Sequence, residues 1–505
     1  MKNLKKHAAR GLVAAMAVSS ILGGCGTTAK ESTSNSSSSA EKKEVAVEDM
    51  PVVQMVAPNG AMTDNTPAIQ EKVNEILAKE AGVQVNITWL GWGAYRDQMN
   101  LMLTGEGEAD LIMLTGFSLP SLVENGQLYD FTDLYEENAS VFTDAVDSAY
   151  LASGEVDGRR YAVPCNNNFS GEACVIVNRQ MADELGFDLS DEKKIWSLDE
   201  IHDMAAAAVE KYPDIYGVVP QSGSTFLTSY TWDTLADGSA VGVVEDCGKT
   251  GKVVSITECE DYLNLARTMR TWYQEGLIMQ DVVSNTETLW SFVPSGKAFC
   301  GFNNGGYPNG TFTEESKYYT LSLMKNCALS SSTMNYAIAG NSQNPEAAFE
   351  VLKELYGNAE VENLLCWGIE GENYVLDDQG RATLPDGVTS ESNTYTVGSV
   401  NPWVLPNMHL TYDNSTTVPG FYKLLEEYDA NAEKSPCIGC IFDSTPVADE
   451  YAACVNVMSK YLQPILSGAV DTDESLEAFK AELKTAGEDK VIAEKQKQLD
   501  AFLSE

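Results

Sequence analysis

The chain has 505 residues, 44% of them apolar, and carries 33 basic and 74 acidic side chains for a formal net charge of −41. This length predicts two to three domains, and the apolar content is sufficient for buried cores. Such an acidic surface repels phosphate backbones and anionic lipid headgroups, which excludes nucleic-acid binding and membrane attachment by charge.

Residues 1–24 have the pattern of a secretory signal peptide. Basic residues between Lys2 and Arg10 precede an apolar run over 12–22, which is shorter than the roughly 20 residues of a membrane span. The run ends in the sequence LGGC at 22–25, which resembles the lipobox of bacterial lipoproteins. The resemblance implies cleavage before Cys25, a lipid on its thiol, and anchoring to the outer face of the cytoplasmic membrane. An ordinary cleaved signal peptide with a chance cysteine is the alternative.

Residues 25–49 are rich in Ser, Thr, Glu and Lys, which predicts a disordered tether. Five elements of alternating type follow. Residues 52–56 read as a buried strand, Thr66-Pro67 as a helix start and Gly82 as its end. A strand over 83–89, a helix carrying Tyr95 and Met99, and a strand over 111–114 come next. This alternation predicts a parallel sheet with covering helices, whose ligands lie beyond the carboxyl ends of the strands. Residues 89–95 and 115–118 are therefore expected at the edge of a cleft.

A second α/β unit is predicted over 165–290. Residues 154–164 read as a connection and 173–177 as a strand. A helix is expected to start after Ser197, with Glu200 in the capping-box position.

Motifs in a fixed order resemble the sugar-type extracellular solute-binding proteins of ABC importers. They are DGRRYAVP at 157–164, VIVNRQMADELG at 175–186, WSLDEI at 196–201, SGKAF at 295–299 and NPEAAF at 344–349. Three more motifs resemble the LipO/LplA-like subgroup of lipoproteins. These are WGIEGENY at 367–374, FDSTPVADE at 442–450 and LKTAGEDKVIAEKQKQLDAFL at 483–503.

The resemblance implies an α/β fold of the type II periplasmic-binding-protein kind, with two lobes that each contain a parallel-rich sheet and flanking helices. It implies a first lobe of 50–160 plus 290–335, a second lobe of 161–289 plus 336–505, and a hinge near 161–164. The implied function is that of a monomeric binding protein, not an enzyme. It would hold a carbohydrate, expected to be an oligosaccharide, between the lobes and deliver it to the permease of an ABC transporter.

Sugar recognition requires aromatic faces for the CH side of the ring and planar polar groups for the hydroxyls. Several aromatic residues stand in loop-like settings beside Gly, Asn or Pro, and the candidates are Trp92, Phe117, Trp232, Tyr307, Trp367 and Trp403. The polar candidates are Asn166 and Asn167, after the first hinge, and Glu370. For each of them, packing in the core or in a turn is the alternative.

The other residues that could form a disulfide, redox or metal site are the cysteines and histidines. Without Cys25, ten cysteines remain, which is compatible with five disulfides of open pairing; the nearest neighbours are Cys165/Cys174 and Cys247/Cys259. The CIGC sequence at 437–440 has redox spacing but no thioredoxin-like βαβ pattern around it. Only two histidines follow the signal peptide, and no metal site or cofactor is predicted. Two alternative functions stay open. One is the same fold binding a peptide or other polar solute, and the other is a glycan-degrading enzyme.

Overall fold

The computed structural model describes residues 46–59, 63–106, 109–115, 117–191, 193–227, 230–304, 317–330, 334–390, 392–396 and 402–504. The predicted signal peptide, Cys25 and most of the predicted tether lie outside these residues. Over the described part of the chain, no helix combines the length and the apolar character needed to cross a membrane.

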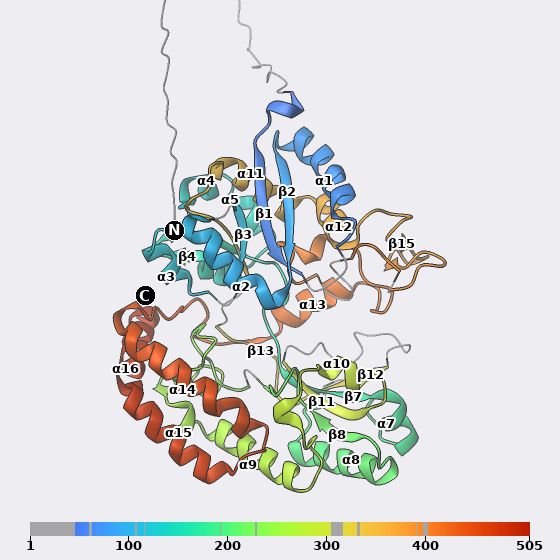
Figure 1. Cartoon of the computed structure of the whole chain (residues 1–505), viewed down its shortest axis with the longest axis vertical. Coiled ribbons are helices and arrows are strands. Elements are labelled where there is room, and N and C mark those ends of the chain that lie inside the picture. Colours follow the sequence, from blue (N-terminus) through green and yellow to red (C-terminus); the bar gives the residue numbers. More distant parts are fainter. Residues whose placement is uncertain are drawn as a thin grey trace, which may run out of the picture. The chain divides into compact units, whose positions relative to one another are not determined.

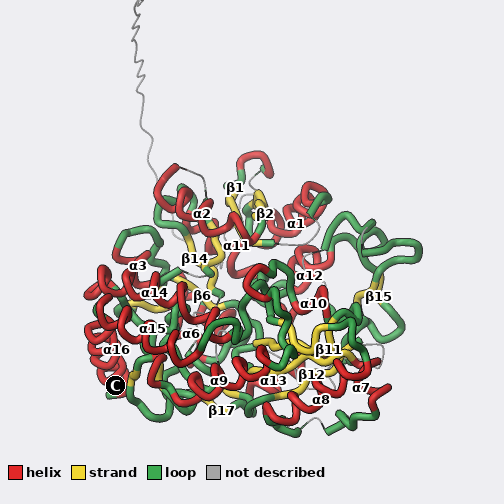
Figure 2. The backbone as a smooth tube through the Cα atoms, turned by 60° about the horizontal axis from the view of Figure 1, so that its bottom comes forward, coloured by secondary structure: helices red, strands yellow, loops and turns green. Residues whose placement is uncertain are grey.

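The first sheet has the strand order β2-β1-β3-β14-β6. Its strands are β1 (Val52–Pro58), β2 (Gln84–Leu90), β3 (Leu111–Leu114), β6 (Ala162–Pro164) and β14 (Asn335–Ile338). β1 pairs in parallel with β2 and β3, whereas β14 runs antiparallel to β3 and β6. The three strands predicted before residue 115 are thus confirmed, and Figure 2 shows β14 and β6 beside one another.

Helices cover both faces of this sheet because alternate strand residues point to opposite sides. In β1, Val53, Met55 and Ala57 face one cluster and Val56 faces another. The first cluster is completed by α1 (Thr66–Glu80), α4 (Thr132–Glu137), α5 (Ala139–Thr143), α6 (Ser148–Leu151), α11 (Pro345–Gly357) and α12 (Ala359–Trp367). The second is completed by α2 (Trp92–Leu101) and α3 (Leu119–Glu124). As predicted, α1 has a proline in its first turn.

The second sheet has the order β12-β7-β11-β8 and lies apart from the first (Figure 1). Its strands are β7 (Ala173–Asn178), β8 (Tyr216–Val219), β11 (Ala298–Asn304) and β12 (Tyr318–Ser322). Only β11 and β8 pair in parallel, while β7 is antiparallel to both of its neighbours. The expectation of a parallel-rich sheet is therefore wrong for this lobe. The placement of 290–335 in the first lobe is wrong for β11 and β12, because their backbones pair with β7.

Helices of the second lobe pack on this sheet and on one another. Those next to the sheet are α7 (Arg179–Leu185), α8 (Leu198–Lys211), α9 (Glu260–Gln274) and α10 (Leu289–Phe292). The predicted capping box of Ser197 and Glu200 starts α8. Three C-terminal helices, α14 (Ala448–Leu466), α15 (Thr472–Ala486) and α16 (Glu488–Leu503), complete the same core (Figure 1). Helices α14 and α15 pack against α9, and α16 packs against α14 and α15.

Short paired strands occur outside the two main sheets. They are β4 (Glu155–Val156) with β5 (Arg159–Arg160), β9 (Val243–Val244) with β10 (Val253–Val254), β13 (Cys327–Ala328) with β17 (Glu433–Lys434), and β15 (Val375–Leu376) with β16 (Ala382–Thr383).

The chain crosses between the lobes at positions that differ from the expected division. The predicted hinge stretch contains β6, which belongs to the first sheet, so the first crossing follows Cys165. After β14 the chain stays in the first lobe, because α11 and α12 pack against β1 and α1. It returns through α13 (Phe421–Ala430) and β17, which pairs with β13. The prediction that all of 336–505 belongs to the second lobe is therefore wrong.

Candidate functional site

A cavity of about 340 Å³ lies between the carboxyl end of the first sheet and the second lobe. We call its two sides the first wall and the second wall. The first wall consists of Arg96, Leu114, Phe117, Ser118, Leu119, Ser153 and Asn335. The second wall consists of Ala236, Asp237, Gly238, Ser239, Ile441, Phe442, Ser444, Tyr451 and Val455. A neighbouring cavity of about 670 Å³ shares Ile441.

The first wall follows directly from the topology of the first sheet. β3 ends at Leu114, and the chain then turns through Phe117 and Ser118 into α3. The Phe117 ring is half-buried, and the Cζ atom of Arg96, from α2, lies 5.9 Å from its centroid. An aromatic face beside an exposed guanidinium is thereby held at the end of a strand.

The second wall is built on an irregular loop between Asp233 and Gly242. Leu235, Ala236 and Ala240 have φ angles of 55°, 58° and 54°. This left-handed backbone costs roughly 1–2 kcal/mol for each residue with a Cβ. Two buried carboxylates stabilise it. The Asp233 carboxylate accepts a hydrogen bond from the Leu235 N–H at 2.8 Å, and that of Asp237 accepts one from the Val241 N–H at 3.0 Å.

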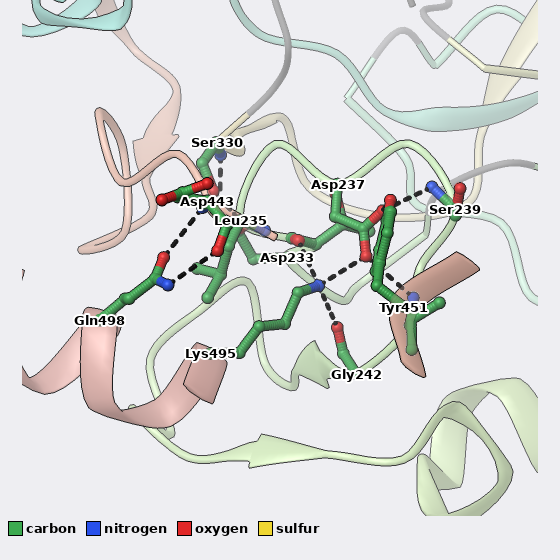
Figure 3. Close-up of polar contacts among 12 residues, drawn as sticks. Asp233, Leu235, Asp237, Ser239, Gly242, Ser330, Asp443, Tyr451, Lys495 and Gln498 are labelled. Atoms are coloured by element: carbon green, nitrogen blue, oxygen red, sulfur yellow. Dashed lines mark hydrogen bonds and ion pairs between the residues drawn. The ribbon is translucent and has the colours of Figure 1, made fainter. Parts of the chain in front are cut away.

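Asp237 also connects the loop to the C-terminal helices, as Figure 3 shows. Its carboxylate accepts hydrogen bonds from the Ser239 N–H at 2.9 Å and from the Tyr451 hydroxyl at 2.7 Å. Burial, followed by the Asp237 charge, raises the pKa of the Tyr451 phenol. The phenol is therefore protonated at neutral pH and donates to the carboxylate.

The two walls combine apolar and polar groups in a small enclosed volume. Phe117, Phe442 and Tyr451 supply aromatic rings, and Arg96 supplies a planar donor. Serine hydroxyls at 118, 239 and 444 add short donors and acceptors. Ligand pockets are typically about 300–1,000 Å³ and mostly apolar with a few directed polar groups, a description that fits this cavity. Such a set is chemically suited to a neutral polyhydroxylated solute, because aromatic faces contact CH groups and the polar side chains can hydrogen-bond hydroxyls.

One sequence-predicted candidate, Phe117, lines this cavity. Two others are core residues. Trp232 is 2% exposed and lies edge-on to Tyr230 and Tyr262, and Trp367 is 7% exposed and donates from Nε1 to the Tyr412 carbonyl at 3.2 Å. Their placement at the cleft is wrong, because neighbouring aromatic rings cover both indoles.

Four further candidates, Asn166, Asn167, Glu370 and Trp403, are not among the described residues that line this cavity. The Asn166 amide donates to Asn407 Oδ1 at 2.8 Å where the chain crosses between lobes, and the Asn167 N–H donates to the Cys165 carbonyl at 3.0 Å. Trp403 packs beside Met408 and Phe421, and Glu370 is exposed in a turn bridged to Tyr374. Of Trp92 the structure describes only the backbone, at the start of α2, while Tyr307 falls outside the described residues.

Sequence reasoning missed Arg96, Phe442 and Tyr451. The signal for the last two was present, since Phe442 opens the FDSTPVADE motif and Tyr451 directly follows it. The motif's position beside a distant loop was not visible in the sequence.

All ten described cysteines are buried, and none of them forms a disulfide. The suggested Cys165/Cys174 disulfide is absent because Cys165 belongs to the core of the first lobe and Cys174 to that of the second. The suggested Cys247/Cys259 pair is absent as well, and the Cys247 thiol instead shares a hydrogen bond with that of Cys327.

Residues 59–362 match the family model of bacterial extracellular solute-binding proteins. The chain belongs to this family. Its C-terminal residues 436–504 match a second model, described as a domain of unknown function (DUF3502). The cavity of this solute-binding protein thus has walls from both matched regions, since Phe117 lies in the first and Tyr451 in the second.

Known proteins resemble this solute-binding protein over half of its length or over nearly all of it. A carbohydrate ABC transporter substrate-binding protein from Streptococcus pneumoniae serotype 4 is 28% identical, with 100% of this chain and 99% of the relative covered. The lipoprotein LipO of Bacillus subtilis is 21% identical over 49% of each chain. The crystal structure of the N-glycan transport solute binding protein NgtS from Streptococcus pneumoniae, in complex with Man5GlcNAc, superposes with a TM-score of 0.73 at 25% identity. The superposition covers 90% of this chain and 99% of NgtS.

Proposed function

We propose that this protein binds a carbohydrate, an oligosaccharide rather than a single sugar, and delivers it to the permease of an ABC transporter. It acts as a monomer and carries out no catalytic step. The similar proteins named for carbohydrate and N-glycan transport support this assignment. Its strongest structural support is the cavity between the lobes, in which Phe117 and Arg96 face Phe442 and Tyr451.

The chemistry of the cavity suits a sugar ring. Aromatic faces contact the CH side of a pyranose, and the guanidinium and hydroxyl groups reach its hydroxyls. The neighbouring cavity, which shares Ile441, provides room for a second or third sugar unit.

Calorimetric titration of the mature protein with defined oligosaccharides tests this function. The panel contains plant-derived oligosaccharides and the mannose-GlcNAc glycan Man5GlcNAc. A ligand present at 100 times its Kd adds about 2.7 kcal/mol of stability, so a thermal-shift screen can precede the titration. Saturable binding without product formation supports the proposal. Absence of binding across the panel contradicts carbohydrate recognition, and release of shorter sugars contradicts a purely binding role.

The anchor is part of the same proposal. Residues 1–24 act as a signal peptide, and Cys25 carries the lipid that holds the protein at the outer face of the cytoplasmic membrane, with 25–49 as tether. The LGGC ending and the similarity to LipO support this. Cys25→Ser is expected to abolish lipid labelling and to release the protein or leave it unprocessed. A variant that still carries lipid and sediments with membranes contradicts the anchor.

A further inference from the structure

One buried lysine in the C-terminal helices contacts three points of the loop that forms the second wall. The Lys495 side chain, from α16, is 0% exposed, and that of its partner Asp237 is 1% exposed. The ammonium donates to Asp237 Oδ2 at 2.7 Å, to the Thr234 carbonyl at 3.1 Å and to the Gly242 carbonyl at 2.9 Å (Figure 3). An ammonium has three donors, so these contacts use all of them.

These contacts brace a backbone that is unfavourable by itself. Leu235, Ala236 and Ala240 lie in the left-handed region, which residues with a Cβ seldom adopt. Such conformations persist only where surrounding contacts determine them. Lys495 bonds the loop near both ends, at Thr234 and Gly242, and in the middle, at Asp237. It therefore fixes the segment 236–239 that faces the cavity.

Lys495 also contacts a second part of the same wall. Its Nζ atom lies 5.0 Å from the ring centroid of Phe442, which lines the cavity. The Asp237 carboxylate in turn accepts from the Tyr451 hydroxyl, another cavity residue. One ion pair thus connects the loop, Phe442 and Tyr451, and neither Lys495 nor the rest of α16 lines the cavity itself.

We propose that Lys495 is a positioning residue for the ligand site, and that holding the second wall in its binding conformation is a role of the C-terminal segment 436–504. The effect on affinity rests on the proposed carbohydrate function, whereas the effect on the loop does not. Loss of Lys495 frees the loop, which then has to be ordered when a ligand binds, so affinity falls.

The test compares Lys495→Met with Lys497→Met. Lys497 is on the same helix, 72% exposed, and pairs only locally with Glu494. The first readout is hydrogen exchange of the ligand-free protein. K495M is expected to speed exchange of the loop amides, including Ser239 and Val241, by at least tenfold relative to the rest of the lobe, and K497M to leave them unchanged. The second readout is the Kd for Man5GlcNAc, expected to rise at least tenfold in K495M and to stay within twofold in K497M.

A buried carboxylate left without its partner is strongly destabilising, so K495M alone is expected to lower the folded yield. The double variant D237N/K495M removes both charges and is expected to show the same loop exchange and the same loss of affinity. Unchanged loop exchange in whichever variant folds, or acceleration spread evenly over the lobe, overturns the positioning role. If the wild-type protein binds no oligosaccharide, the proposed function fails, while the exchange measurement still decides the role of Lys495.

Discussion

The two walls of the cavity are held in place by different kinds of interaction. The first wall continues regular elements, since Phe117 and Ser118 occupy the short turn between β3 and α3. The second wall depends on a left-handed loop fixed by buried charges, with partners such as Lys495 and Asp237 that are 258 positions apart. Local hydrogen-bonded structure positions one wall and long-range polar contacts position the other. We therefore expect the second wall to be far more sensitive to the loss of a single buried polar group.

Replacing Asp233 provides the largest expected effect. Its carboxylate accepts hydrogen bonds from the Leu235 N–H, from the Ser330 N–H and hydroxyl, and from the Ser435 hydroxyl. Asp233→Ala leaves these buried donors without an acceptor, which costs about 3–5 kcal/mol of unfolding free energy. It is also expected to weaken ligand binding, because the loop starts at this residue. Chemical denaturation and calorimetry measure the two effects.

Asp110→Ala is the matched control in the first lobe. The Asp110 carboxylate is buried and accepts from the Gln54 N–H at 2.8 Å and from the Ser342 hydroxyl, at the opposite end of the first sheet from the cavity. This variant is expected to lose stability and to keep its affinity. Equal losses of affinity in both variants would contradict a special dependence of the second wall on buried polar groups.

Glu172 is a buried carboxyl outside both walls, where few partners offset its burial. Desolvation raises its pKa to about 7, although the Ser322 hydroxyl donates to it. The folded protein therefore holds this proton above pH 4.5 while the unfolded chain releases it, so wild-type stability falls as pH rises from about 4.5 to 7. Glu172→Gln lacks this penalty and is expected to gain on the order of 3 kcal/mol relative to wild type over that range, and nothing below it. Denaturation curves of both proteins at pH 4 and pH 8 measure the difference, and a difference independent of pH would refute it.

The sequence predicted the first lobe better than the second, because the first wall depends on local structure and the second on contacts between distant segments. Alternation and turn signals over 52–114 depend on neighbours in the chain. They predicted three strands correctly, and Phe117 follows the end of the third. Trp367 was misjudged because the glycine after it suggested an exposed turn. Gly368 does have a φ of 86°, but Tyr374 and the Tyr412 carbonyl, brought over by the segment that follows, cover the indole. The partners of Asp237 and Asp233 come from distant segments, so no local sequence pattern predicted the second wall.

The smallest expected effect distinguishes a residue of the cavity wall from a residue of the hydrophobic core. Phe117→Ala is expected to raise the Kd for an oligosaccharide by about 30-fold, equivalent to roughly 2 kcal/mol, as for an aromatic hot spot. Its stability should change little, because the ring is half-buried. Trp367→Ala is the control with the opposite profile, expected to lose about 3–5 kcal/mol of stability and to bind normally once folded. Normal binding by Phe117→Ala would remove it from the site.

A ligand held between the lobes is expected to contact both walls at once. Hydrogen exchange of the wild-type protein with and without saturating Man5GlcNAc, or whichever oligosaccharide of the panel binds, measures this directly. Protection is expected to increase together at 114–119, at 236–241 and at 441–455, with little change around Trp367. Saturable binding that protects neither wall, or that protects only the surroundings of Trp367 and Trp403, would contradict it.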